Sequence, residues 1–146
     1  MNPQPRNVLL CTDSAAEAGT RGAEALQLKV LDFGLAVARG AQSPTGELLG
    51  TLLYMAPELF QGDAGGPETD LYAVGVMAYE LLAGHHPFAH HRDSASLLSA
   101  ILTETPDLTP LSQWPTLSTL IGSLLSKDPA LRPHSAERVL TKIHAE

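Results

Sequence analysis

The chain has 146 residues, enough for one domain, and a chain of this length buries about 68–70% of the surface that it exposes when unfolded. Its formal net charge of -7, without a lysine or arginine cluster, excludes the basic surface that binds nucleic acid, so we expect no nucleic-acid partner. The single cysteine, Cys11, excludes an internal disulfide and suits a reducing cytoplasm.

No membrane segment is expected. The longest apolar-rich run, from Leu71 to Ala83, contains Glu80 and is too short to span a bilayer. The residues after Met1 do not show the basic start and apolar stretch of a signal peptide. We therefore expect a soluble, cytoplasmic protein without membrane attachment.

Two short strands are predicted near the start of the chain. Residues 8–11 are an apolar run, and residues 26–30 alternate between apolar and polar side chains as a half-buried strand does. The residues between them, 12–24, have no clear apolar face, so we expect a hairpin with an extended, exposed turn. Residues 36–49 are rich in turn-forming glycine, serine and proline, which favours a long loop.

A nearly all-apolar helix is predicted from Glu68 to Leu82. Its apolar residues recur at helical spacing, and Gly84 provides a C-terminal stop. A helix that is apolar on most sides must be covered on most sides. We expect it to form the axis of the core.

Three further helices are predicted in the second half. Ser94 is expected to cap the first, residues 117–125 form the second, and Ser135 caps the third, with Glu137 in its first turn. Residues 105–115 are expected to form a packed connection. The predicted fold class is therefore α+β, mainly α-helical, with a short β-hairpin.

Several motifs stand in a fixed order along this pattern. Asp32, Phe33 and Gly34 follow the second strand, although such a tripeptide alone is more often a plain turn. The later motifs are GTLLYMAPE at 50–58, DLYAVGVMAYELLAG at 70–84, HPF at 86–88 and KDPALRP at 127–133. This set resembles the large, C-terminal lobe of a bacterial-type serine/threonine protein kinase.

The resemblance implies one partial kinase domain over residues 1–146. Residues 1–11 would end the catalytic loop, 26–58 would hold the metal-binding hairpin and activation segment, and 67–146 the helical subdomain. The small lobe, with the glycine-rich loop and strand lysine that hold ATP, is absent from this sequence. The implied activity is transfer of the γ-phosphoryl group of ATP to protein serine or threonine hydroxyls, with ATP and Mg²⁺ as cofactors.

The resemblance also assigns roles to residues near the first motifs. Asn7 and Asp32 match the two residues that hold Mg²⁺. Phe33 and Gly34 complete the first border of the activation segment. Thr51 matches a threonine of the substrate-docking loop, and its alternative is a turn-capping threonine.

Three other residues match structural positions of the family. Glu58 matches the glutamate of a buried ion pair whose arginine is here Arg132. Asp70 is implied to brace the catalytic loop, although an aspartate there could simply favour the helix dipole. The helix that precedes the catalytic loop in kinases is not in this sequence, so we expect an exposed apolar patch on the helix at 71–82.

Two positions depart from the kinase pattern. Counting back from Asn7 places Asn2 in the slot of the catalytic aspartate and Gln4 in that of the neighbouring lysine. An amide cannot accept a proton as a carboxylate does, nor neutralise a phosphoryl group as an ammonium does. We therefore expect no catalysis by this chain alone.

Three interpretations stay open. The chain could contribute to phosphoryl transfer together with a missing small-lobe chain. It could be a non-enzymatic, pseudokinase-like module that binds kinase partners. It could also be a truncated gene remnant, in which case the first residues, 1–4, reflect a misplaced start.

A histidine cluster surrounds the HPF motif. His85, His86, His90 and His91, with Asp93 as the only nearby acidic residue, could bind Zn²⁺ or Ni²⁺. In kinases this stretch is a solvent-facing connection between helices. We favour the exposed-loop interpretation.

Overall fold

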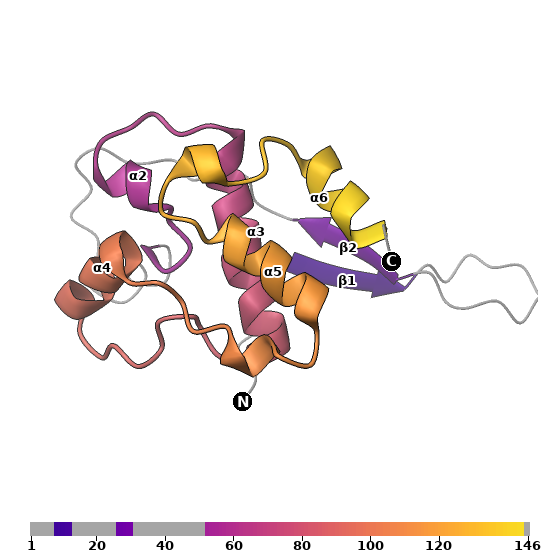
Figure 1. The fold of residues 1–146 in the computed structure, drawn as a ribbon, viewed down its shortest axis with the longest axis horizontal. Coiled ribbons are helices and arrows are strands. Elements are labelled where there is room, and N and C mark those ends of the chain that lie inside the picture. Colours follow the sequence, from indigo (N-terminus) through magenta and orange to yellow (C-terminus); the bar gives the residue numbers. More distant parts are fainter. Residues whose placement is uncertain (1–7, 13–25, 31–51, 145–146) are drawn as a thin grey trace, which may run out of the picture. The chain divides into compact units, whose positions relative to one another are not determined.

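The computed structural model describes residues 8–12, 26–30 and 52–144 (Figure 1). The chain divides into two compact units, residues 1–42 and 43–146. We call them the hairpin unit and the helical unit, after their described parts. The loop expected at 36–49 lies outside the described residues.

The hairpin unit contains two strands, β1 (Val8–Thr12) and β2 (Leu26–Val30). They pair antiparallel, with Val8 opposite Val30 at one end and Thr12 opposite Leu26 at the other. Apolar residues at every second position of β2 give the pattern expected of a strand with one covered face.

In the described part of the helical unit, the short helix α2 (Pro57–Phe60) is followed by the long helix α3 (Pro67–Ala83). At the start of α3, the hydroxyl of Thr69 accepts a hydrogen bond from the backbone N–H of Gly66, at 3.0 Å. The helix ends at Gly84, whose φ of 79° is left-handed and whose N–H donates to the carbonyl of Glu80. The predicted stop is therefore confirmed.

The core of this unit forms where α3 packs against α5 (Pro115–Leu124) and the short 3₁₀ turn η1 (Thr109–Leu111). Seven buried residues make its main cluster: Ala56, Tyr72, Val76, Tyr79, Leu111, Ile121 and Leu125. Gly75 allows the close approach, because a Cβ at this position would lie 2.8 Å from the Cβ of Leu124. The connection at 105–115 is packed as predicted, since Leu111 is fully buried.

The two remaining helices are α4 (Ser94–Thr103) and α6 (Ala136–His144). The predicted cap of α4 is wrong by one residue: Asp93, not Ser94, accepts a hydrogen bond from the N–H of Ser96, at 2.8 Å. An aspartate carboxylate reaches this N–H from the non-helical position that precedes the helix. The predicted cap of α6 is confirmed, because Ser135 accepts from the N–H of Arg138.

The helix α3 is buried on one side only. Tyr72 and Val76 are fully buried, whereas Val74 is 41% exposed and Leu81 is 64% exposed. The exposed apolar patch predicted for this helix is therefore present, and α3 borders the core instead of being covered all round. None of the helices in the described part of the chain has the length and apolar character needed to cross a bilayer.

Candidate functional site

The residues with predicted metal and catalytic roles lie outside the described part of the chain. They are Asn2, Gln4, Asn7, Asp32, Phe33, Gly34 and Thr51. The strands beside two of them are described: β1 begins directly after Asn7, and β2 ends two residues before Asp32. Val8 and Val30, the strand residues nearest to them, are partners in the hairpin. The two predicted metal ligands thus flank the same end of the hairpin in sequence.

Glu58 and Arg132 form a buried ion pair in the helical unit. Glu58 lies in α2, and Arg132 directly follows the 3₁₀ turn η2 (Pro129–Leu131). Arg132 Nη1 lies 2.7 Å from Glu58 Oε1, and Nη2 lies 2.8 Å from Oε2. The two residues are only 5% and 2% exposed. Two parallel hydrogen bonds between charged groups are the strongest form of this contact.

The other polar atoms of the ion pair are also bonded. The Arg132 guanidinium donates to the backbone carbonyls of Ser126 (2.8 Å), Glu68 (3.0 Å) and Lys127 (3.2 Å). The hydroxyl of Thr69 donates to Glu58 Oε1 at 2.8 Å. The guanidinium also lies over the ring of Tyr72, 5.0 Å from its centroid. Arg132 therefore joins α2, the start of α3 and the end of α5 at one point.

Electrostatics keep Glu58 charged. Burial alone raises the pKa of Glu58, but hydrogen bonds from Arg132 and Thr69 outweigh burial and hold the pKa below its ordinary value. Both carboxylate oxygens are engaged by protein donors. This geometry suits a structural ion pair, not a proton acceptor or a metal ligand.

Two more contacts fix the segment at 52–55, which directly follows Thr51. His86 Nδ1 accepts from the N–H of Phe88, so Nε2 carries the proton and donates to the carbonyl of Leu53 at 2.9 Å. The hydroxyl of Tyr54 donates to Glu80 at 2.6 Å. Burial lowers the pKa of His86, which favours this neutral tautomer. Sequence reasoning missed both contacts, because their partners are far apart along the chain.

Asp70 lies exposed in the first turn of α3. An acidic side chain there favours the positive end of the helix. The catalytic loop that it was expected to brace lies outside the described residues, so the bracing role stays a prediction.

The four clustered histidines separate into two pairs. His86 is buried and bonded to backbone, and His85 Nδ1 lies 3.0 Å from the carbonyl of His86. His90 and His91 instead face Glu104, the residue after α4. No local sequence pattern pointed to Glu104, which lies thirteen residues after His91.

An apolar groove runs between three helices. Its lining includes Val74, Ala78 and Leu81 of α3, Leu117 and Leu120 of α5, and Ile143 of α6. The residues that line the groove in the described part of the chain are all apolar. The groove is continuous with the exposed patch on α3.

Comparison with known proteins gives one family. The model of the protein kinase domain matches residues 4–143. The chain is 40% identical over 107 residues to the serine/threonine-protein kinase drp72 of Corynebacterium efficiens, covering 72% of this chain and 20% of that protein. It is 37% identical over 111 residues to the serine/threonine-protein kinase PknA of Mycobacterium tuberculosis, covering 75% and 26%. The chain thus spans about a fifth to a quarter of these relatives.

Proposed function

This chain belongs to the protein kinase family, and we propose that it forms the magnesium-binding and substrate-docking part of a serine/threonine kinase. The relatives drp72 and PknA are serine/threonine-protein kinases by name. The proposed reaction transfers the γ-phosphoryl group of ATP to a serine or threonine hydroxyl of a protein. We propose the cytoplasm as its location, since ATP is available there.

The register of the hairpin is the observation that carries this proposal. Val8 and Val30 are paired, Asn7 precedes Val8 by one residue and Asp32 follows Val30 by two. Backbone lengths then limit the distance between the Cα atoms of Asn7 and Asp32 to about 16 Å at most. This limit is compatible with a shared site, and we propose that the two oxygen-bearing side chains bind a common pair of metal ions.

The donor set fits the expected metal. Mg²⁺ prefers hard oxygen ligands, and Asn7 and Asp32 offer an amide and a carboxylate oxygen. When bound, Mg²⁺ neutralises charge on the phosphates of ATP. Asp32 and Asn7 would hold the ion, and Phe33 and Gly34 would begin the segment that leads to Thr51.

The anchors of the helical unit support the docking role of Thr51. The residues that follow it are held by three contacts: His86 to the carbonyl of Leu53, Tyr54 to Glu80, and Glu58 to Arg132. A docking loop must be positioned by a rigid support to orient an incoming hydroxyl. We propose that these contacts provide that support for the substrate side of the site.

We propose that the chain does not complete the reaction alone. Asn2 cannot take the proton of the acceptor hydroxyl, and Gln4 cannot neutralise the transferred phosphoryl group. The groups that hold the α- and β-phosphates are not among these 146 residues. Activity would therefore require these groups from residues outside this sequence.

The alternative function is a non-catalytic module that binds kinase partners. The uncharged side chains of Asn2 and Gln4 favour it, because both replace residues that a kinase needs for catalysis. A gene remnant without a function of its own would share these two features.

A fusion protein tests the proposal. The small-lobe segment of PknA, ending just before the position that corresponds to Asn2, would be joined to this chain, once with Asn2 and Gln4 and once with Asn2→Asp and Gln4→Lys. We expect Mg²⁺-dependent phosphorylation of a generic serine/threonine protein substrate by the second fusion only. Adding Asp32→Ala should reduce that rate by at least a hundredfold.

Two results would reject the proposal. One is a folded, ATP-binding Asn2→Asp, Gln4→Lys fusion that transfers no phosphate. The other is full activity after Asp32→Ala, which would contradict the proposal that the hairpin unit binds the magnesium. Asp63→Ala is the control at an exposed aspartate of the helical unit, and its fusion should retain both ATP binding and phosphoryl transfer.

A further inference from the structure

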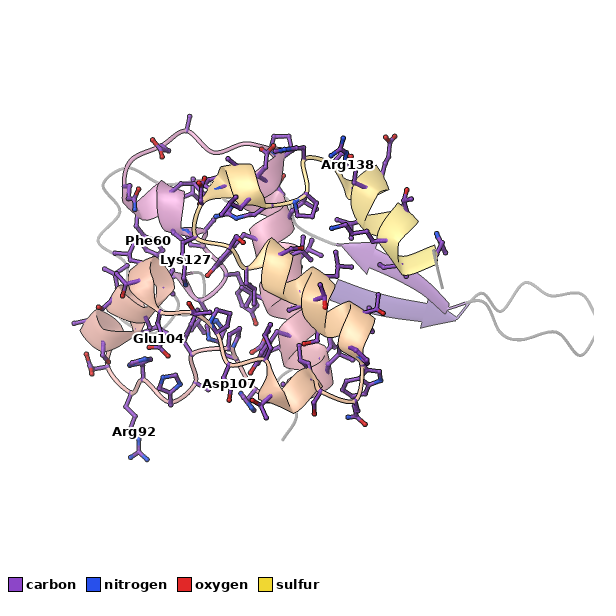
Figure 2. The ribbon with its side chains drawn as sticks, in the orientation of Figure 1. Phe60, Arg92, Glu104, Asp107, Lys127 and Arg138 are labelled. Atoms are coloured by element: carbon purple, nitrogen blue, oxygen red, sulfur yellow. The ribbon has the colours of Figure 1, made fainter. Side chains whose placement is uncertain are left out.

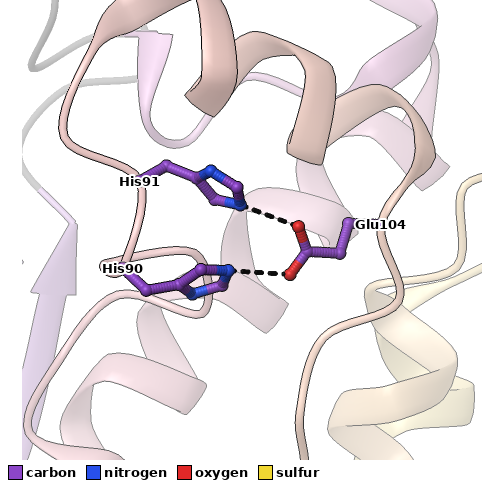
Figure 3. A group of neighbouring side chains, drawn as sticks. All are labelled: His90, His91 and Glu104. Atoms are coloured by element: carbon purple, nitrogen blue, oxygen red, sulfur yellow. Dashed lines mark hydrogen bonds and ion pairs between the residues drawn. The ribbon is translucent and has the colours of Figure 1, made fainter.

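Three potential metal ligands converge beside the helix α4, as Figure 3 shows. Nε2 of His90 lies 2.9 Å from one carboxylate oxygen of Glu104, and Nε2 of His91 lies 2.7 Å from the other. All three ligand atoms lie within 4.8 Å of one another. The two imidazole rings lie against each other, with centroids 4.1 Å apart. One donor atom of each side chain thus lies near a donor atom of the other two.

These donors are accessible. The side chains of His90, His91 and Glu104 are 60%, 23% and 38% exposed. His86, by contrast, uses both ring nitrogens in contacts with backbone atoms and is buried. Only the second pair of histidines therefore keeps its Nε2 atoms directed at a carboxylate near the surface.

We propose that His90, His91 and Glu104 bind a Zn²⁺ ion, with water as the fourth ligand. Two imidazole nitrogens and one carboxylate oxygen are a known ligand set for zinc with an open position. Mg²⁺ and Ca²⁺ prefer oxygen ligands only, so the two histidines select against them. This site uses other residues than the proposed magnesium ligands, and its existence does not depend on the proposed kinase function.

To bind one ion, ligand atoms that are now as much as 4.8 Å apart must come to within about 3.3 Å of one another by side-chain rotation. Zinc bonds of about 2.0–2.1 Å in a tetrahedron place neighbouring ligand atoms about 3.3 Å apart. The two hydrogen bonds would therefore lengthen by roughly half an ångström when the ion replaces their protons. Exposed histidine side chains can make this change by rotation about their side-chain bonds.

Nearby cations do not occupy the site. Lys127 interacts electrostatically with Glu104, but its ammonium donates to the carbonyls of Ala100 and Ile101 at the end of α4. Burial lowers the pKa of Lys127 to about 8, so its ammonium keeps most of its charge at pH 7, but that charge is directed at the two carbonyls. Arg92 is exposed, and in Figure 2 its side chain points away from the labelled Glu104.

Bound zinc would join the two ends of one segment. His90 and His91 precede α4, whereas Glu104 follows it and donates its backbone N–H to the carbonyl of Ala100. The ion would close this segment as a crosslink does and restrict the unfolded chain. We therefore expect Zn²⁺ to raise the unfolding temperature.

The test is zinc titration of the tag-free chain in competition with a chromophoric chelator. We expect one Zn²⁺ per chain, and at least tenfold weaker binding in each of His90→Ala, His91→Ala and Glu104→Gln. The matched control is His134→Ala, which removes the histidine of another exposed histidine–glutamate pair, His134 Nδ1 to Glu68 Oε1 at 3.2 Å. Circular dichroism would show that every variant keeps its helix content.

These measurements distinguish a specific zinc site from the general affinity of exposed histidines for zinc. No stoichiometric binding by the folded chain would overturn the proposal. Equal weakening by His134→Ala or His85→Ala would also overturn it, because the ion would then bind exposed histidines at large. Unchanged affinity in Glu104→Gln would exclude the carboxylate as a ligand.

Discussion

The hairpin unit carries the predicted magnesium ligands beside two five-residue strands, whereas the helical unit carries three clusters of buried apolar residues. A two-stranded hairpin supplies little core of its own. The helical unit in turn engages its most buried charges, Glu58 and Arg132, with each other. Stability and phosphate chemistry should therefore respond to substitutions in different units.

The largest expected effect is on the buried ion pair. Arg132→Met leaves the Glu58 carboxylate buried without its partner, which should lower the free energy of unfolding by about 3–5 kcal/mol. Urea unfolding followed by circular dichroism measures this change. The double variant Arg132→Met, Glu58→Gln should lose less free energy of unfolding than the two single variants lose in sum. A strictly additive loss would show that the two residues are not coupled.

A smaller loss is expected where α3 meets α5. A Cβ at Gly75 would lie 2.8 Å from the Cβ of Leu124, and overpacking of this kind costs about 1–3 kcal/mol. Alanine has a better helix propensity than glycine, which offsets about 1 kcal/mol of this cost. The free energy of unfolding of Gly75→Ala should therefore be lower by up to about 2 kcal/mol.

Gly122→Ala is the matched control for this packing. Its Cβ would meet only Cδ1 of Leu108, the far end of a flexible side chain. We expect this variant to unfold at the same urea concentration as the parent or a higher one. Equal losses in the two variants would contradict the packing argument.

The free energy of unfolding should depend on pH because the imidazole of His86 is buried. Burial lowers the pKa of His86 below the ordinary value of 6.5, so the unfolded chain binds a proton before the folded chain does. The stability that neutral His86 contributes is fully present above pH 6.5 and is lost as the pH falls through the pKa of His86 in the folded chain. The free energy of unfolding then changes by at most about 1.4 kcal/mol per pH unit. In His86→Gln, the urea midpoint of unfolding should change less between pH 7 and pH 5 than in the parent. An equal change in both proteins would contradict the role of His86 in this pH dependence.

The smallest expected effect on stability is at Asp32. Asp32→Ala should change the free energy of unfolding of the helical unit by no more than about 0.5 kcal/mol, because the residue belongs to the other unit. The same urea titration measures it. A decrease in the free energy of unfolding comparable to that of Arg132→Met would contradict the separate roles assigned to the two units.

Much of the helical unit could be predicted from sequence, since local patterns determine it. The 3.6-residue spacing of apolar side chains located α3 and α5, and Gly84 located the end of α3. The cap at Ser94 was misplaced because Asp93 and Ser94 are both good caps, and only backbone geometry separates them.

The candidate sites were less predictable, because their partners are distant in sequence. A resemblance to kinases paired Glu58 with Arg132, whereas periodicity could not have done so across 74 residues. Nothing in the sequence indicated that His90 and His91 would face Glu104, since that contact depends on how the chain enters and leaves α4. The roles of Asn7, Asp32 and Thr51 stay predictions.

The most direct test of the account is the phosphoryl-transfer rate of the Asn2→Asp, Gln4→Lys fusion carrying Asp32→Ala, measured at a temperature where urea titration shows it as stable as its parent fusion. We predict that Mg²⁺-dependent transfer is lost while stability is retained. Transfer that persists under these conditions would contradict the claim that the hairpin unit supplies the chemistry and the helical unit the support.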